Sequence, residues 1–223
     1  MQMDKVDKLH KETVSETLRN VLFQLMGIEA LSPFRLVGGT ALSLQLGHRK
    51  SVDIDLFTDV EYGSLDFNVI DDKLKELFPC VEMQYEGNDS FGKSYYVGNS
   101  KSDIVKVDLF YTDTFIRPVI EIEHIRLASL EEIAAMKMEV IGQNGRKKDF
   151  WDIHELFEAI PLDRMMALHA ERYPYSYSKE ELRKKLVDFD YADSDFDPVC
   201  LKGKFWELIK EDIRELENNL NIY

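Results

Sequence analysis

The sequence predicts an α+β protein: a mixed sheet flanked by helices, followed by an all-helical C-terminal half. Short β-branched runs with a period of two recur between residues 34 and 125, and none follows residue 129. After that point apolar residues recur at helical spacing. With 223 residues, of which 44% are hydrophobic, the chain can bury one sizeable core or a core with a smaller second lobe. We therefore expect an α/β domain over residues 1–127 and a helical domain over residues 128–223.

Apolar periodicity and turn residues locate the elements of the first half. Helical spacing predicts helices over residues 7–26, 40–46 and 65–77. Alternation predicts strands over residues 34–37, 51–57, 81–85, 93–97, 104–111 and 119–125. The strands at 81–85 and 93–97 are expected to form a hairpin around a turn at residues 86–89.

In the second half, Ser129 and Glu132 have the spacing of a capping box, which predicts a helix to about residue 143. Gly142 and Gly145 bracket the end of that helix. Further helices are expected over residues 148–160, 163–172, 178–189 and 205–219. The acidic stretch at residues 188–198 is the most loop-like part of this half.

The formal net charge of −14 argues against a surface that binds nucleic acid everywhere, because such binding depends mainly on cationic contacts to phosphate. A local basic patch, or attraction of divalent metals, is compatible with this charge. Cys80 and Cys200 are isolated and indicate neither a disulfide framework nor a zinc site. The first residues lack the apolar core of a signal peptide, and no apolar run is long enough to span a membrane. We expect a cytoplasmic protein without a membrane partner.

Two aspartates inside the strand at residues 51–57 require an explanation. Asp53 and Asp55 stand at i and i+2, so their carboxylates project to the same side of the strand and repel each other unless a cation lies between them. Asp108 is a third aspartate in the middle of an apolar strand. Three carboxylates are typical of sites that hold Mg²⁺ beside substrate phosphates. The alternative is that all three are solvated on an exposed face of the sheet.

Gly38, Gly39 and Thr40 end one strand and open a helix just before the aspartates. Glycine lets the backbone approach a ligand closely, and a helix start directs N–H groups toward an anion such as a triphosphate. The pair could equally be a simple tight turn. It is not a P-loop, because the G-x-x-x-x-G-K-[ST] pattern is absent. Arg49, close in sequence to the Asp53 strand, is a further candidate for an anion contact.

Lys137 shares an apolar helix face with Ile133 and Ile141. Its ammonium either extends along that face to water or reaches the phosphates of a nucleotide. One helix later, Asp149 and Asp152 lie one turn apart beside a core stripe. The basic run at residues 146–148 precedes them, and it is either a solvated helix start or a contact for substrate phosphate.

These motifs resemble the nucleotidyl transferase AbiEii family, toxins of type IV toxin-antitoxin systems within the polymerase-beta-like nucleotidyltransferase superfamily. The similar segments are "LVGGTALSLQLGHRKSVDIDLF", "KVDLF" and "SLEEIAAMKMEVIGQNGRKKDFWDIHELF", in that order and between residues 34 and 157. The superfamily motif opens with Gly-Ser, whereas this chain has Gly38-Gly39-Thr40, the variant typical of the AbiEii-like branch.

The resemblance implies an enzyme that binds an NTP and Mg²⁺ (or Mn²⁺). It implies that Asp53, Asp55 and Asp108 hold metal, with Asp108 completing the first site or acting as base. Gly38, Gly39, Thr40 and Arg49 would contact the nucleotide. Lys137 would meet the triphosphate, and Asp149 and Asp152 would order the same side of the site. Family toxins are implied to act on tRNA 3′ ends or related acceptors and to be restrained by a separate antitoxin.

Two other functions are compatible with the same residues. An acidic surface would suit the nucleotidylation of a protein at least as well as that of tRNA. A module that binds a nucleotide or a partner without catalysis would need no set of three strand aspartates. A phosphohydrolase of the haloacid-dehalogenase type also uses Asp-x-Asp, but Phe57 stands where that class needs Thr or Val.

Overall fold

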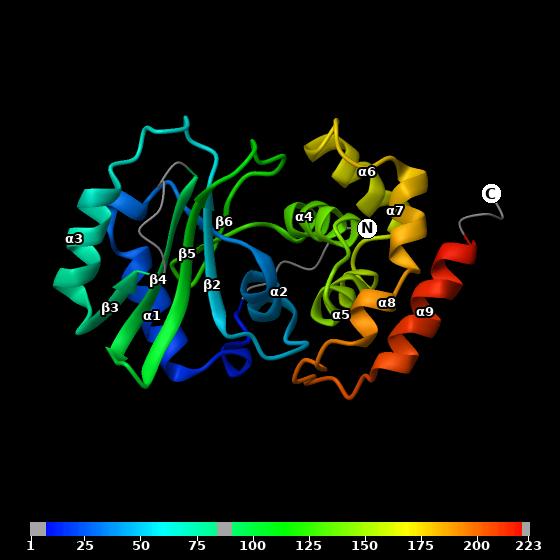
Figure 1. Cartoon of the computed structure of the whole chain (residues 1–223), viewed down its shortest axis with the longest axis horizontal. Coiled ribbons are helices and arrows are strands. Elements are labelled where there is room, and N and C mark those ends of the chain that lie inside the picture. The colour runs from blue at the N-terminus through cyan, green and yellow to red at the C-terminus, as the bar shows by residue number, and fades with distance from the viewer. Residues whose placement is uncertain (1–7, 84–90, 220–223) are drawn as a thin grey trace. The chain divides into compact units, whose positions relative to one another are not determined.

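The computed structural model describes residues 8–83 and 91–219 (Figure 1). The chain divides into two compact units, which we name the sheet unit and the helical unit. The sheet unit contains residues Val6–Gln45 and Ser51–Ala128, and the helical unit contains Leu46–Lys50 and Ser129–Tyr223. Within the described ranges, no helix is both long and apolar enough to cross a membrane.

The sheet unit is built on one seven-stranded mixed sheet with the order β3-β4-β5-β2-β1-β7-β6 among the described residues. Pairing is parallel between β2 and β5 and between β1 and β7, and it is antiparallel elsewhere. The strands are β1 (Arg35–Leu36), β2 (Asp53–Thr58), β3 (Cys80–Met83), β4 (Gly92–Ser100), β5 (Asp103–Tyr111), β6 (Ile120–Ile122) and β7 (Ile125–Leu127).

One face of this sheet is covered by helices. Burial alternates along β2 and β5, so that Ile54 and Leu56, together with Val107 and Leu109, are buried while their neighbours are only half-buried. α1 (Glu16–Met26) packs along β4, β5 and β7, and α3 (Phe67–Leu77) packs on β3 (Figure 1). The expected α+β class of a mixed sheet with flanking helices is confirmed.

The remaining elements of the sheet unit are short. They are the 3₁₀ turns η1 (Lys11–Thr13) and η2 (Glu29–Leu31) and the helix α2 (Gly38–Leu46). The opening helix predicted over residues 7–26 is therefore divided, because Ser15 caps a new helix by accepting a hydrogen bond from the Leu18 N–H.

The strand predicted over residues 119–125 is wrong, because β6 and β7 form a tight hairpin there. Glu123 and His124 both have positive φ, of 50° and 65°, as a two-residue primed turn requires. Neither residue is a glycine or asparagine, so the sequence carried no turn signal. The other predicted hairpin turn, at residues 86–89, lies outside the described residues.

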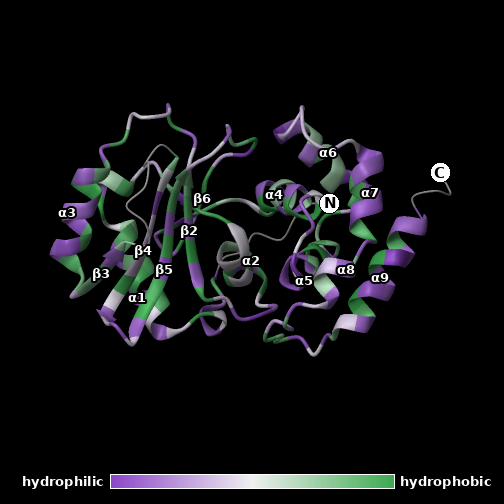
Figure 2. Ribbon diagram, in the orientation of Figure 1, coloured by the Kyte–Doolittle hydropathy of each residue, from purple (hydrophilic) through white to green (hydrophobic). Residues whose placement is uncertain are grey.

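The helical unit contains α4 (Leu130–Gly142), α5 (Lys147–Leu156), α6 (Leu162–Arg172), α7 (Lys179–Leu186), α8 (Asp190–Asp193) and α9 (Trp206–Asn219). The helices α7 and α9 are amphipathic, with apolar and polar residues on different sides, as the colours in Figure 2 show. The predicted all-helical C-terminal half is confirmed. The acidic stretch expected to be a loop contains the short helix α8.

Details of α4 differ from the expectation. Ser129 caps the helix by accepting from the Glu132 N–H, but the Glu132 carboxylate pairs with Arg172 at 2.6 Å. Val140, which precedes Ile141 in the same helix, is exposed. The predicted face of Ile133, Lys137 and Ile141 is buried, together with Ala134 and Met138.

Leu46–Lys50 joins the helical unit although its neighbours in sequence belong to the sheet unit. Arg49 forms an antiparallel bridge with Cys200. The Lys50 N–H donates to the Val199 carbonyl at 2.9 Å, and the Leu201 N–H donates to the His48 carbonyl at 2.8 Å. These backbone hydrogen bonds fix the segment against the loop that precedes α9.

Candidate functional site

The start of α2 lies against β2 within the sheet unit. Gly38 has a φ of +65°, and a Cβ placed on it would lie 2.7 Å from Asp55 Oδ2. Only glycine can adopt this positive φ and lie this close to the carboxylate without strain. The Val37 N–H donates to the Asp55 carbonyl at 2.9 Å, which fixes the strand end beside this carboxylate. The glycine turn thus lies close to Asp55, whereas its predicted approach to a nucleotide stays a prediction.

Thr40 positions the backbone of Asp53. Its hydroxyl donates to the Asp53 carbonyl at 2.5 Å and lies 2.7 Å from the Ser51 hydroxyl. The residue is 1% exposed. A direct contact of Thr40 with a nucleotide, as predicted from the sequence, stays a prediction.

The three predicted aspartates share one face of the sheet. Asp55 and Asp108 are Cα partners in the parallel register of β2 and β5, and Lys106 is the partner of Asp53. We name these four residues the acidic face. Phe57 and Phe110 continue the same face by one further step, with ring centroids 6.2 Å apart. The sequence alone did not reveal this register.

Lys106 neutralises part of the acidic face. Its Nζ donates to Asp108 Oδ2 at 2.6 Å, and its side chain is 31% exposed. Partial burial opposes the charged form, but Asp108, followed by Asp53 and Asp55, raises the pKa of Lys106 above its ordinary value. Sequence reasoning missed Lys106, although its i, i+2 spacing from Asp108 was visible.

The donor atoms of the acidic face fit a hard divalent cation. Asp108 Oδ1 is buried and has no hydrogen-bond partner, so a polar atom there is unsatisfied. Carboxylate oxygens are the ligands that Mg²⁺ and Mn²⁺ prefer. In residues 8–83 and 91–219, however, no three carboxylate, imidazole or thiol side chains are already close enough to share one metal ion. The arrangement therefore provides ligands without a preformed site.

A second group of predicted residues meets inside the helical unit. Asp152 is fully buried and binds Arg49 through two hydrogen bonds, Nε to Oδ1 at 2.7 Å and Nη2 to Oδ2 at 2.8 Å. His48 Nε2 lies 2.8 Å from Oδ1, and Lys137 Nζ lies 2.7 Å from Oδ2. Lys137 also donates to Asp149 Oδ1 at 2.6 Å. We name these five residues the buried charge cluster.

Electrostatics explain why Asp152 and Lys137 stay ionised. Burial alone would raise the pKa of Asp152, but Arg49 and then Lys137 hold it well below its ordinary range. Burial likewise opposes a charged Lys137, yet Asp152 and Asp149 raise its pKa. The ammonium of Lys137 neither extends to water nor stands alone, since its side chain is only 8% exposed. The predicted contacts of Arg49, Lys137 and Asp152 with a nucleotide stay predictions.

Asp149 has a second role at the start of α5. Its Oδ2 accepts a hydrogen bond from the Arg146 N–H at 3.0 Å while its Oδ1 binds Lys137. The basic run around it faces the acidic stretch, because Arg146 pairs with Asp195 at 3.1 Å and Lys147 with Asp197 at 2.9 Å. Two residues of the basic run are therefore paired with carboxylates and are not simply solvated.

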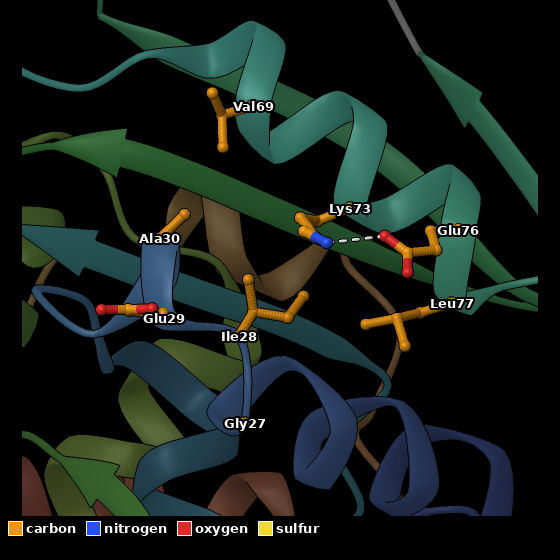
Figure 3. A pocket seen from close by; sticks show the side chains of 8 residues that line it. All are labelled: Gly27, Ile28, Glu29, Ala30, Val69, Lys73, Glu76 and Leu77. Carbon is orange, nitrogen blue, oxygen red and sulfur yellow. Dashed lines mark hydrogen bonds and ion pairs between the residues drawn. The ribbon is translucent and has the colours of Figure 1, made fainter.

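A separate hollow of about 500 Å³ lies between the residues that follow α1 and one side of α3 (Figure 3). Its walls include Val69 and Leu77 and an ion pair between Lys73 and Glu76 at 2.7 Å. None of the predicted site residues lines it. The hollow is thus unrelated to the acidic face.

A family model and a relative of known sequence each match most of this chain. The family model described as "Nucleotidyl transferase AbiEii toxin, Type IV TA system" matches residues 20–217. An uncharacterized protein of Aquifex aeolicus (strain VF5) is 28% identical over 216 residues, which cover 93% of this chain and 88% of that protein.

Solved structures share the fold. A nucleotidyltransferase toxin of Mycobacterium tuberculosis H37Rv, MenT4, superposes with a TM-score of 0.59 at 13% identity, over 92% of this chain and 83% of that one. JHP933 of Helicobacter pylori superposes with a TM-score of 0.54 at 19% identity, over 94% and 98% of the two chains.

The fold and the family match together define a nucleotidyltransferase. More specifically, the chain belongs to the nucleotidyl transferase AbiEii toxin family of type IV toxin-antitoxin systems. The family predicted from the sequence motifs is thereby confirmed.

Proposed function

We propose that this protein transfers a nucleotidyl group from an NTP to an acceptor hydroxyl with the help of Mg²⁺ or Mn²⁺, and that the acceptor is the 3′ end of a tRNA. The observation that supports it most is the acidic face, in which Asp55 and Asp108 lie side by side on paired parallel strands and Asp108 Oδ1 lacks a partner. A site of this kind suits chemistry that neutralises phosphate charge.

In the proposed reaction the acceptor oxygen forms a bond to the α-phosphorus, the bond from that phosphorus to the bridging oxygen breaks, and pyrophosphate leaves. Asp53, Asp55 and Asp108 would hold the metal, which neutralises charge on the phosphates when it is bound. Asp108 is also the group assigned to take up the proton of the hydroxyl. Catalysis would come mainly from positioning and charge.

The remaining residues receive supporting roles in the proposal. Gly38, Gly39 and Thr40 would bring the first N–H groups of α2 to the triphosphate, supported by the close approach of Gly38 to Asp55. Lys137, held by Asp149 and Asp152, would supply a positive charge to the phosphates. A cognate antitoxin encoded as a separate chain is proposed as the natural inhibitor, on the basis of the family.

The test is a labelling assay with α-³²P NTPs, one nucleotide at a time, with Mg²⁺ and either total tRNA or cell protein as acceptor. The wild type is expected to label tRNA, and Asp53→Asn with Asp55→Asn is expected to label nothing while keeping its circular dichroism spectrum. Asp72→Asn removes an exposed carboxylate of α3 and serves as the control that keeps full activity.

Each outcome of the assay has a distinct meaning. Label on protein instead of tRNA would replace the acceptor assignment with protein nucleotidylation, which the net charge of −14 favours. Equal labelling by the wild type and the double variant would refute the assignment of Asp53 and Asp55.

A further inference from the structure

Lys106 is the cation of the acidic face. It stands opposite Asp53 in the parallel register of β2 and β5, and it shares its own side of β5 with Asp108 two residues on. Its Nζ lies 2.6 Å from Asp108 Oδ2. An ammonium at this point lowers the repulsion among three carboxylates that face the same way.

The same contact bears on how Asp108 could bind a metal. One oxygen of Asp108 is bound to Lys106, and the other is buried without a partner. A divalent cation that binds Asp53, Asp55 and Asp108 together would place its charge close to the ammonium. The two cations therefore repel each other and compete for the negative charge of Asp108.

We propose that Lys106 is a built-in counter-ion of the acidic face, which holds Asp108 in the absence of a divalent cation and withdraws from it when the cation binds. Lys106 is then a positioning residue that sets the affinity of the site for metal. This inference rests on the proposed function, because it takes Asp53, Asp55 and Asp108 to be the ligands.

The side chain of Lys106 is suited to such a movement. It has four flexible methylene groups and remains 31% exposed, so its ammonium can turn to water at little cost. By contrast Lys137 is 8% exposed and its ammonium is held by two aspartates. Lys106 is thus a weakly held cation beside a group of hard ligands.

The test is isothermal titration calorimetry of MnCl₂ into the full chain without nucleotide. Lys106→Met is expected to bind Mn²⁺ about tenfold more tightly than the wild type, because the competing charge is gone. Lys106→Arg keeps the charge and is expected to bind within about threefold of the wild type. Lys106→Gln is a second neutral variant in case the methionine disturbs folding.

Lys101→Met is the matched control for the loss of one positive charge. Lys101 is 88% exposed and lies on the turn between β4 and β5, 3.5 Å from Glu82. Its removal is expected to change Mn²⁺ affinity by less than about twofold, since an exposed charge in water is strongly screened.

The experiment distinguishes failure of the counter-ion role from failure of the metal assignment. If the two neutral Lys106 variants bind Mn²⁺ no more tightly than the wild type, while Asp53→Asn with Asp55→Asn abolishes binding, the counter-ion role is refuted and the metal site stands. If the double aspartate variant binds Mn²⁺ as well as the wild type, the metal assignment itself falls, and the inference falls with it. Thermal unfolding with and without Mn²⁺ gives a second readout, in which the neutral variants are expected to gain more stability from the metal.

Discussion

Arg49 and Asp152, which are 103 positions apart in sequence, form a bidentate ion pair in which both side chains are buried. The planar guanidinium matches the carboxylate, and two parallel hydrogen bonds fix both groups in one geometry. Because His48 and Lys137 bind the same carboxylate, Asp152 is the centre of the buried charge cluster. Removal of the Asp152 carboxylate would leave the buried cations Arg49 and Lys137 without the negative charge that neutralises them both.

Asp152→Asn is therefore expected to lower the free energy of unfolding by about 3–5 kcal/mol at pH 7. The measurement is urea unfolding followed by circular dichroism. Asp212→Asn is the control: Asp212 is 39% exposed and pairs with His154 at 2.7 Å, so its loss should cost less than about 1 kcal/mol. Equal costs for the two variants would contradict the central role of Asp152.

The same pair predicts a dependence of stability on pH. The pKa of Asp152 is lowered by folding, so the stabilisation is fully present above the unfolded value of about 3.9 and is lost as the pH falls from there through the folded value. The difference in unfolding free energy between the wild type and Asp152→Asn should be constant from about pH 5 to 7 and shrink below about pH 4.

Gly38→Ala is expected to destabilise the protein and to abolish nucleotidyl transfer. The new methyl group would meet Asp55 Oδ2 at 2.7 Å, and the φ of +65° adds backbone strain. Gly63→Ala is the control, because Gly63 has a φ of +79° with nothing within 4 Å of the added carbon. It should show only the backbone cost of about 1 kcal/mol. A Gly38 variant no worse than the Gly63 variant in both assays would exclude a role for the contact with Asp55.

Thr40→Val is expected to cost about 1–3 kcal/mol, because the Asp53 carbonyl loses a buried donor. Thr40→Ser retains the hydroxyl and should recover most of that free energy. Thermal unfolding of both variants measures the difference. Valine and serine variants of equal stability would show that the hydroxyl contributes nothing to holding Asp53.

Two ion pairs between α4 and α6 allow a comparison of buried and exposed charge. Arg172 and Glu132 are both fully buried, 2.6 Å apart, whereas Arg164 and Glu131 are 45% and 25% exposed and 2.9 Å apart. Arg172→Met should cost about 3–5 kcal/mol, because it strands a buried carboxylate. Arg164→Met should cost less than about 1 kcal/mol. Chemical denaturation of the two variants side by side is the measurement, and a cost for Arg164→Met as large as that for Arg172→Met would contradict the comparison.

Local sequence pattern was enough for most of the fold and for the composition of the acidic face. Alternation in "VDIDLF" and "KVDLF" predicted two strands with aspartates on one side, and both strands exist as β2 and β5. Their parallel pairing, which brings Asp55 beside Asp108, depends on strand order and cannot be read from either strand alone. Lys106 was also missed: its spacing from Asp108 was visible within the strand, but its place opposite Asp53 depends on the pairing of β2 with β5.

Long-range pairing also explains what was missed in the helical unit. Arg49 was assigned to a phosphate because it stands close in sequence to the Asp53 strand. Its partner Asp152 is on α5, and no local pattern indicates that contact. The missed hairpin of β6 and β7 has a different cause, since Glu123 and His124 adopt a turn conformation that their residue types rarely signal.

The placement of Leu46–Lys50 in the helical unit has a consequence for the order of events during synthesis on the ribosome. This segment is made early, but Asp152 and the loop at residues 199–201 that bind it are made only after another 100 residues or more. Arg49 therefore cannot pair with Asp152 until 152 of the 223 residues have been translated. A fragment that begins at Ser129 would keep all six helices α4–α9 and yet lack the guanidinium that neutralises Asp152.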